Sequence, residues 1–435
     1  MPDKKDLNFA FIGAGSAVFT LQRVSDILKN DDFISGGELR LVDTDPAALE
    51  TAYGAVAALV KTCGRGFAVT RHTDFREALP GLDFIFFTFV SGGFDSWRTD
   101  VDICTRHGVL QSVGDTIGPG GIIRALRNAP VVVEIAKEME RVCPNAWAIN
   151  YSNPEGALSL AIEKYTSIRT FGLCHGTPDT IKKIAEEVFG ADMRRVDYNA
   201  AGVNHLTWIT SLHIDGEDVY PTLAQRMRAA GFDKKEPISF ALFELFGLYP
   251  APGDRHVCEF FPFYLKENVL QRRDYKWKNV DFAMLIEGRE RSRELLAKVR
   301  DGSVGLDGLH CGESAMSFVR ALMTGETARE MANVVNRGYI ENVSDGTVVE
   351  LPAFVDHFGL HPQKIGRLPE GIAAKCDALG REYSLAVSAA LTCDKKAALQ
   401  AMILDPLVSN CEDPAALLDD LLFMYKDILP SGWNL

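Results

Sequence analysis

The 435-residue sequence has no long hydrophobic run, because its densest apolar stretch, Phe84–Val90, covers seven residues. A membrane-spanning helix needs about 20 apolar residues, so we expect no membrane association. The first residues lead into an apolar strand pattern with no signal-peptide core before it. The nine cysteines are scattered without a disulfide-like rhythm, which is typical of a reducing compartment. We therefore expect a cytoplasmic protein.

Basic residues are also scarce, with 46 Lys and Arg against 59 Asp and Glu and a formal net charge of −13. A nucleic-acid partner would need a basic footprint, so this balance argues against one. A small anionic substrate remains compatible with it, because one or two arginines suffice to bind such a molecule. The sequence also lacks repeats, low-complexity tracts and Ser/Gly linkers. Hydrophobic residues make up 47% of it, a globular composition whose length fits two domains.

The first part of the chain alternates short apolar runs with helix-like segments, which is typical of a parallel sheet covered on both faces. The expected strands are Asn8–Gly13, Leu39–Asp43, Phe67–Arg71, Asp83–Phe89, Ala146–Tyr151 and Thr170–Cys174. The expected helices are Ala17–Leu28, Pro46–Thr62, Ile122–Glu140, Glu155–Tyr165 and Pro178–Phe189. Six strands with five crossovers make a complete dinucleotide-binding sheet. We therefore predict an α/β fold whose residues 1–195 form a Rossmann domain with a doubly wound parallel sheet, similar to malate and lactate dehydrogenases.

Beyond residue 195 the alternation ends. Amphipathic helices are expected over Ser292–Val299, Ala328–Asn336 and Pro369–Leu391. The tail from Lys395 to Leu429 has a helical pattern with an interruption at Pro406. We interpret residues 196–435 as a mostly helical α+β domain that provides substrate and metal contacts. Its long apolar helices favour self-association, and we expect a homodimer or homotetramer.

A glycine turn predicts a nucleotide site, because Gly13, Gly15 and Ser16 directly follow the first strand and open the first helix. Glycines at such a turn let backbone N–H groups approach a pyrophosphate at the positive end of a helix. Val18 occupies the position of the usual third glycine, so an empty structural turn is the alternative interpretation. Asp43 ends the second strand, where a carboxylate binds ribose hydroxyls and repels a 2′-phosphate. This arrangement favours NAD over NADP.

Three later stretches concentrate chemically active side chains. The first is Cys174–Thr177 at the end of the sixth strand, where ligands of open α/β sheets gather. The others are Gly202–Trp208, which contains His205, and Gly253–Phe260. Taken singly, a cysteine or histidine in such a place is more often a buried structural residue. Together Cys174 and His205 could bind a transition metal and leave coordination positions open for substrate oxygens.

These stretches resemble the NAD- and Mn²⁺-dependent glycoside hydrolases of family 4 over essentially the full length of the chain. The matching pieces are the FIGAGS start, Asp115–Ile122, Asn153-Pro154, Cys174–Thr177, Gly202–His205, Gly253–His256, Glu259-Phe260, Asn336–Ile340 and Val349–Pro352. The resemblance implies hydrolysis by redox elimination rather than by two carboxylates. NAD⁺ takes a hydride from C3 of the sugar, a base removes the C2 proton and the aglycone leaves C1. Water then adds, and the bound NADH returns the hydride.

The resemblance also implies a set of catalytic residues. Cys174 and His205 would hold Mn²⁺ against the C2 and C3 oxygens of the sugar. His175 would protonate the leaving oxygen, since imidazole titrates near neutral pH. Asp254 is the candidate base at C2, and Tyr249 is its rival.

Five further residues are implied to contact substrate or cofactor. Asn153 would orient the sugar, and Asp115 would line the nicotinamide side of the cleft. The His-Gly pair after the cysteine is similar to the α-galacturonidase and α-glucuronidase branch, whose substrates carry a C6 carboxylate. Arg98 and Arg255 are the candidate partners of that carboxylate, with His256 beside them. An α-galacturonide is thus the favoured substrate, ahead of an α-glucuronide.

Other interpretations remain open. A neutral α-galactoside or α-glucoside fits the same family. An NAD-dependent 2-hydroxy acid dehydrogenase would use His205 as proton relay and Arg98 as carboxylate clamp, but it leaves Cys174 and His175 without a role. A non-catalytic NAD-sensing protein would need no metal pair at all. Structurally, Asp115 could cap a helix and Asp254 could belong to an ion network with Arg255.

Overall fold

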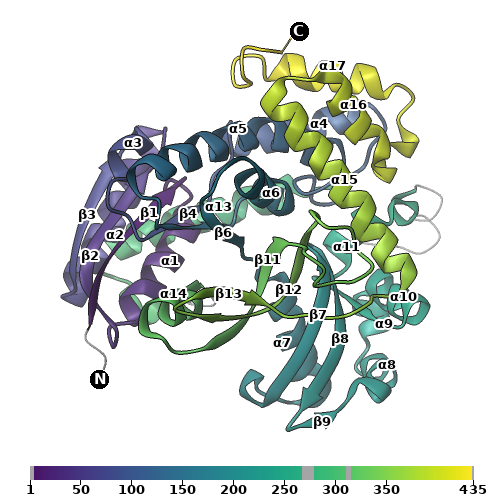
Figure 1. Ribbon diagram of the computed structural model, residues 1–435, viewed down its shortest axis with the longest axis horizontal. Helices are drawn as coiled ribbons and strands as arrows, with labels where there is room; N and C mark the ends of the chain where they lie inside the picture. The colour runs from purple at the N-terminus through teal and green to yellow at the C-terminus, as the bar shows by residue number, and fades with distance from the viewer. Residues whose placement is uncertain (1–3, 267–278, 310–314, 434–435) are drawn as a thin grey trace.

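The computed structural model describes residues 4–266, 279–309 and 315–433. Its first six strands are parallel and lie in the order β3-β2-β1-β4-β5-β6 (Figure 1). They span β1 Lys5–Ile12, β2 Ile34–Val42, β3 Gly66–His72, β4 Phe84–Phe87, β5 Trp147–Asn150 and β6 Arg169–Gly172. This is the strand order of a complete dinucleotide-binding sheet. The predicted fold class is confirmed.

Seven helices accompany these strands. They are α1 Ala17–Lys29, α2 Pro46–Cys63, α3 Phe75–Ala78, α4 Gly93–Arg106, α5 Gly118–Val142, α6 Glu155–Tyr165 and α7 Gly176–Phe189. Local sequence sets the ends of α2, since the Asp45 side chain accepts hydrogen bonds from the first turn and Gly64 ends the helix with a left-handed φ of 63°. The polar helix α4 had no counterpart among the expected elements.

The same sheet continues into the second half in the order β6-β11-β12-β7-β8-β10, with antiparallel pairing throughout. Its strands are β7 Val196–Val203, β8 Leu206–Ile214, β9 Glu217–Asp218, β10 Tyr249–Ala251, β11 Ala328–Val335, β12 Val348–Asp356 and β13 Gly359–Pro362. The helices there are α8 Tyr220–Ala229, α9 Phe232–Lys235, α10 Pro237–Phe246, α11 Asp254–Phe260, α13 Phe282–Arg300, α14 Ala315–Thr324, α15 Glu370–Thr392, α16 Lys395–Leu404 and α17 Pro414–Met424. Short 3₁₀ turns are η1 Met193–Arg195, η2 Pro262–Leu265, η3 Leu306–Gly308 and η4 Pro406–Asn410.

The expected helix at Ala328–Asn336 is wrong, because this segment forms strand β11 in the middle of the sheet. It pairs over its whole length with β12, and Asn333 also pairs with Gly172 of β6. The tertiary pairing overrides a local pattern that suits either structure, and the β-branched pair Val334-Val335 fits a strand better than a helix. The sheet in the second half is therefore larger than expected.

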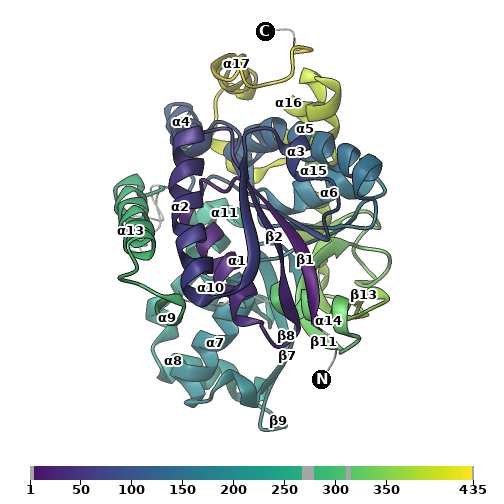
Figure 2. The same ribbon diagram turned by 90° about the vertical axis from the view of Figure 1, so that its left-hand side faces the viewer.

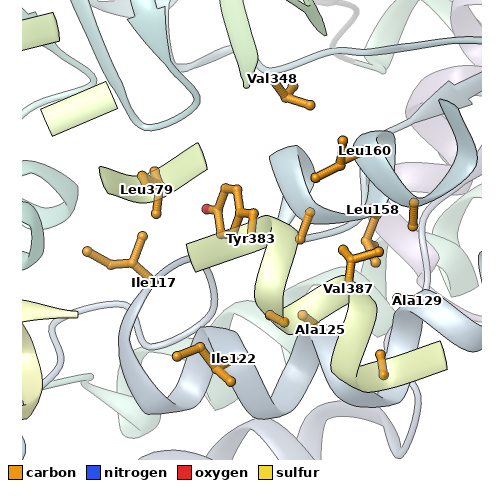
Figure 3. Packing of buried hydrophobic residues seen from close by; sticks show 14 of the residues in the cluster. Ile117, Ile122, Ala125, Ala129, Leu158, Leu160, Val348, Leu379, Tyr383 and Val387 are labelled. Atoms are coloured by element: carbon orange, nitrogen blue, oxygen red, sulfur yellow. The ribbon is translucent and has the colours of Figure 1, made fainter. Parts of the chain in front are cut away.

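Helices cover both faces of the sheet (Figure 2), and a layer of buried hydrophobic side chains lies on each face. Alternate residues of β1 and β4 serve the two layers, so that Phe9 and Phe86 pack toward α1 and α2 while Ala10 and Phe87 pack toward α5 and α6. Burying one large apolar side chain contributes about 1.5–3 kcal/mol. Helix α15 joins the second layer across α5 and α6, where Tyr383 and Val387 pack beside Ile117 and Leu158 (Figure 3). No helix among the described residues is long and apolar enough to cross a bilayer.

A buried ion pair ties the C-terminal helices to the Rossmann half. Arg127 of α5 donates to both carboxylate oxygens of Asp100 on α4, at 2.9 and 2.6 Å, and both side chains are fully buried. The hydroxyl of Tyr425, which follows α17, donates to Asp100 Oδ1 at 2.5 Å, and the Arg127 guanidinium lies 4.0 Å from the centre of its ring. The position of α4 thus depends on the end of the chain.

We predict that Arg127→Met lowers the free energy of unfolding by about 3–5 kcal/mol, because it leaves the Asp100 carboxylate buried without its cation. Adding Asp100→Asn should recover part of that loss, since no unpaired charge then remains. Urea denaturation measures both variants. Arg141→Met is the control, because Arg141 pairs with Glu138 at the surface, and its effect should stay below about 1 kcal/mol. Equal effects of Arg127→Met and Arg141→Met would contradict the proposed cost.

Candidate active site

The glycine turn and Asp43 meet at the carboxyl ends of β1 and β2. The Gly15 N–H donates to Asp43 Oδ2 at 2.7 Å, and Asp45 N–H donates to Oδ1 at 2.9 Å. A Cβ atom on Gly15 would lie 2.7 Å from Asp43 Oδ2, so only glycine fits there. Gly13 has a φ of 90°, which also favours glycine. Ser16 is the N-cap residue of α1. The predicted nucleotide residues therefore form a cradle with a carboxylate fixed beside it.

Cys174 and His175 lie between β6 and α7, where His175 is the N-cap residue of the helix. Cys174 is half-buried, and His175 is exposed. Burial raises the pKa of the Cys174 thiol, the Glu350 carboxylate raises it further, and hydrogen bonds from Gly176 N–H and Asn204 oppose the rise. A thiol in such surroundings stays protonated unless a cation stabilises its anion.

His205 lies opposite, in the two-residue turn that joins β7 and β8, with a left-handed φ of 65°. Its Nδ1 lies 2.8 Å from Thr116 Oγ1, and its ring centre lies 4.5 Å from that of His256 on α11. Burial lowers the pKa of His205 to about 4, although the nearby Asp115 opposes this shift. The imidazole is therefore neutral at pH 7, the form that binds metals.

Asp115 occupies the centre of the site. Thr116 Oγ1 donates to its Oδ1 at 2.7 Å, Asn153 Nδ2 donates to its Oδ2 at 3.0 Å, and Arg124 lies 3.7 Å from Oδ2. Burial acts to raise the pKa of Asp115, but the charge of Arg124 and the hydrogen bonds from Thr116 and Asn153 oppose it, and the pKa is lowered. Asp115 is thus an ionised carboxylate that links the segments carrying Asn153 and His205.

The loop that presents Asp115 and Thr116, residues 111–118, is held by side chains from distant parts of the chain. Glu259 Oε1 accepts from Val113 N–H at 2.9 Å and from Gly114 N–H at 3.0 Å. Asp405 Oδ2 accepts from Gly118 N–H at 2.6 Å. The Tyr383 hydroxyl donates to the Thr116 carbonyl at 3.0 Å. These acceptors and donors are buried, so the loop backbone is fixed without help from water.

The two candidate bases are placed differently from the other residues. The Asp254 carboxylate accepts from Ile238 N–H at 3.0 Å and Ser239 N–H at 2.7 Å, and so caps helix α10. Burial raises its pKa to about 6. Tyr249 is buried on β10, with its ring against that of Phe243 in a separate hydrophobic cluster. Their catalytic roles stay predictions.

The predicted arginines also differ. Arg255 directly precedes His256 on α11, and the His256 ring centre lies 4.5 Å from that of His205. Arg98 lies on an exposed part of α4, where it pairs weakly with Asp102 at 3.9 Å. Among the described residues no group of three or more His, Cys, Asp and Glu side chains is placed to hold a metal ion. A metal bound here would have few protein ligands, and oxygen atoms of the substrate would have to complete its coordination.

A cavity of about 520 Å³ opens beside Cys174 and His175. Its walls come from α1, the start of α7, α14 and the first residues of β11, and include Asp26, Arg320 and Glu330. Carboxylates, an arginine and hydroxyl groups line it, so it can accept a polar molecule the size of a sugar.

The comparison with known families decides what this constellation belongs to. The family 4 glycosyl hydrolase model matches residues 8–189, and the model of the family 4 C-terminal domain matches residues 200–408. This chain is a family 4 glycosyl hydrolase.

Relatives of this family 4 enzyme are named for several different substrates. An α-galactosidase of Bacillus subtilis is 31% identical over 97% of this chain and 98% of its own length. An α-galacturonidase of the same organism is also 31% identical, over 96% of this chain and 97% of its own. The crystal structure of a 6-phospho-β-glucosidase from Thermotoga maritima, with manganese, NAD⁺ and glucose-6-phosphate, is 25% identical with a TM-score of 0.82, covering 97% and 99% of the chains.

Sequence reasoning on the family 4 enzyme missed the residues that support its site. Thr116 stands inside a matching glycine-rich stretch, yet its contact with His205 crosses 89 positions of sequence. Glu350, also in a matching stretch, accepts from Thr177 Oγ1 at 2.7 Å and Asn204 Nδ2 at 3.2 Å. A buried glutamate in an apolar strand was the available signal. Nothing in the sequence points to Tyr383 or Asp405.

We predict that Glu259 of the family 4 enzyme makes stability fall as pH rises. Burial raises its pKa to about 8, against a usual 4.5, so the folded state holds an extra proton. Its contribution is complete below about pH 4.5 and is lost progressively as pH rises toward 8. In Glu259→Gln the slope of unfolding free energy over this range should be smaller, because the amide does not titrate, while its oxygen still accepts both N–H groups.

Glu259→Ala is the matched comparison, because it leaves two buried N–H groups without an acceptor and should cost about 3 kcal/mol. Urea denaturation between pH 5 and 8 measures all three proteins. An unchanged slope in Glu259→Gln would show that the proton is held elsewhere.

Proposed function

We propose that this enzyme hydrolyses α-hexuronosides, α-galacturonides ahead of α-glucuronides, with NAD and Mn²⁺ as cofactors. The reaction proceeds by oxidation at C3, deprotonation at C2, loss of the aglycone and addition of water. One observation carries the proposal: the His205 ring lies 2.8 Å from Thr116 Oγ1, which is bonded to Asp115, and 4.5 Å from the ring of His256, which directly follows Arg255 on α11. A metal-binding imidazole thus lies close to the segment that carries a cation for a carboxylate.

The residues present fit both cofactors. The Gly13–Ser16 cradle suits a pyrophosphate, and Asp43 suits a ribose diol. The Cys174 thiol and the neutral His205 imidazole suit a transition metal. Asn204, which directly precedes His205, forms a hydrogen bond with the thiol and so links the two residues. When bound, NAD supplies a hydride acceptor at C3, and Mn²⁺ supplies a Lewis acid for the C2 and C3 oxygens.

The chain's own groups then position the sugar and move its protons. Asn153, fixed by its bond to Asp115, orients the ring. His175 is exposed and lines the 520 Å³ cavity, so it can protonate the oxygen of an aglycone held there. Asp254, with a pKa of about 6, is the proposed base, since its two accepted hydrogen bonds leave lone pairs free.

The uronate preference rests on Arg255. Arg255 directly precedes His256, whose ring centre lies 4.5 Å from that of His205, so we propose that its guanidinium pairs with the C6 carboxylate of the sugar. Arg98, on the exposed side of α4, is the weaker candidate. A neutral α-galactoside is the second candidate substrate, because an α-galactosidase is as similar to this chain as an α-galacturonidase.

The assay that tests the proposal uses p-nitrophenyl α-galacturonide, α-glucuronide and α-galactoside with a thiol reductant. We expect release of nitrophenol to require NAD⁺ and Mn²⁺ together, with the galacturonide cleaved fastest. Absorbance of NADH should not accumulate, because the hydride returns in each turnover. Preference for the galactoside would transfer the proposal to α-galactosidase. Lasting NADH formation from a hydroxy acid without glycoside cleavage would overturn it.

We predict that Cys174→Ser abolishes glycoside cleavage and leaves NAD⁺ binding intact, because a hydroxyl is a poor substitute for a thiolate ligand. Activity assays and a fluorescence titration with NAD⁺ measure the two effects. Cys63→Ser is the control, because Cys63 ends helix α2 away from the site. Activity retained in Cys174→Ser would remove the cysteine from the metal site.

A further inference from the structure

The hydrogen bonds around Thr116 determine which nitrogen of His205 carries its proton. A threonine hydroxyl has one hydrogen to donate. Thr116 Oγ1 lies 2.7 Å from Asp115 Oδ1 and 2.8 Å from His205 Nδ1. Asp115 is an ionised carboxylate held by Arg124 and Asn153, so it can only accept, and the hydroxyl hydrogen must point toward it. The bond on the other side therefore has His205 Nδ1–H as donor and the Thr116 oxygen as acceptor.

With the hydrogen on Nδ1, Nε2 is the ring nitrogen left to offer a lone pair to a metal. If Thr116 donated to Nδ1 instead, two oxygen acceptors would face each other at 2.7 Å with no hydrogen between them. Metal-ligating histidines commonly donate their second N–H to a carboxylate or carbonyl, which fixes the ring and makes it more basic. Here the Thr116 hydroxyl lies between His205 and the Asp115 carboxylate, because it donates to Asp115 and accepts from His205.

The backbone of Thr116 is held by a side chain from helix α15. The Tyr383 hydroxyl donates to its carbonyl, and the Tyr383 ring reaches it from α15 past Ile117 (Figure 3). Gly156 on α6 makes room for that ring, since a Cβ there would lie 2.7 Å from Tyr383 Cε2. Gly118, two residues after Thr116, is held by Asp405. The backbone that carries the Thr116 side chain is thus held by Tyr383 and Asp405, which fixes the position of its hydroxyl.

We infer that Thr116 is a positioning residue that sets the tautomer and ring orientation of His205, with Tyr383 as its support from α15. The role of Thr116 in metal binding rests on the proposed function, whereas the tautomer of His205 is a property of the metal-free protein. Thr116 and Tyr383 act through His205 and need not touch the substrate. Their loss should therefore weaken metal binding while NAD⁺ binding persists.

The tautomer is measured directly in the metal-free protein labelled with ¹⁵N-histidine. Long-range ¹H–¹⁵N spectra distinguish a protonated ring nitrogen from one with a lone pair, and His205→Gln identifies the signal. We expect a protonated Nδ1 and an unprotonated Nε2 in the wild type. In Thr116→Val, whose side chain has the same shape and no oxygen, the two tautomers should mix. An unprotonated Nδ1 in the wild type would overturn the inference.

Metal affinity gives the second measurement, from the electron paramagnetic resonance signal of free Mn²⁺. Thr116→Val should bind Mn²⁺ about 10–100-fold more weakly, Tyr383→Phe should lose less, and Thr116→Ser should stay close to the wild type. Thr392→Val, on the exposed end of α15, is the matched control and should change nothing. Thermal unfolding shows whether each variant is folded. If Thr116→Val does not fold, the difference in Mn²⁺ affinity between Thr116→Ser and Tyr383→Phe tests the inference instead.

The outcomes separate the two proposals. If the wild type binds no Mn²⁺ but shows the expected tautomer, the metal role fails and the arrangement at His205 stands. If the wild type binds Mn²⁺ and Thr116→Val binds it equally well, the positioning role is overturned while the proposed function survives.

Discussion

The site depends on buried hydrogen bonds to the backbone of the loop at residues 111–118. Glu259, Tyr383 and Asp405 each hold a different peptide group of this loop, and none of them belongs to the Rossmann half. A loop fixed in this way can present Asp115 and Thr116 without the variation expected of a surface segment. Both side chains then reach other strand ends: Asp115 contacts Asn153 after β5, and Thr116 contacts His205 between β7 and β8.

A continuous sheet makes this geometry possible. Pairing of β6 with β11, and of β12 with β7, carries the sheet from the nucleotide side to the turn that holds His205. Cys174 and His205 come from opposite sides of this junction, and Glu350 on β12 bonds groups near each of them, Thr177 and Asn204. Asn153, Cys174 and His205 therefore all follow strands of one continuous sheet.

Local pattern was enough to predict the Rossmann strands, because each combines a short apolar run with a helix of clear period. It was also enough to predict the glycine turn and Asp43, because these residues lie within 30 positions of each other in the sequence. It failed for β11, where pairing with β12 and not local preference determines the structure. It also failed for Thr116 and Tyr383, because their partners are 89 and 267 positions away and neither residue type is unusual where it stands. The position of Asp254 at the start of α10 was hidden for the same reason: the N–H groups it binds precede it by 15 and 16 positions.

The hydrogen bond between Asp405 and Gly118 spans 287 positions, and that between Tyr425 and Asp100 spans 325. A ribosome makes the chain from its N-terminus, so the nucleotide half emerges long before these partners exist. Until residue 405 has left the ribosome, the N–H of Gly118 lacks its carboxylate and α4 lacks the tyrosine that fixes it. A chain that ends before residue 405 can thus contain the whole parallel sheet and still lack the carboxylate that holds Gly118 in the loop at residues 111–118.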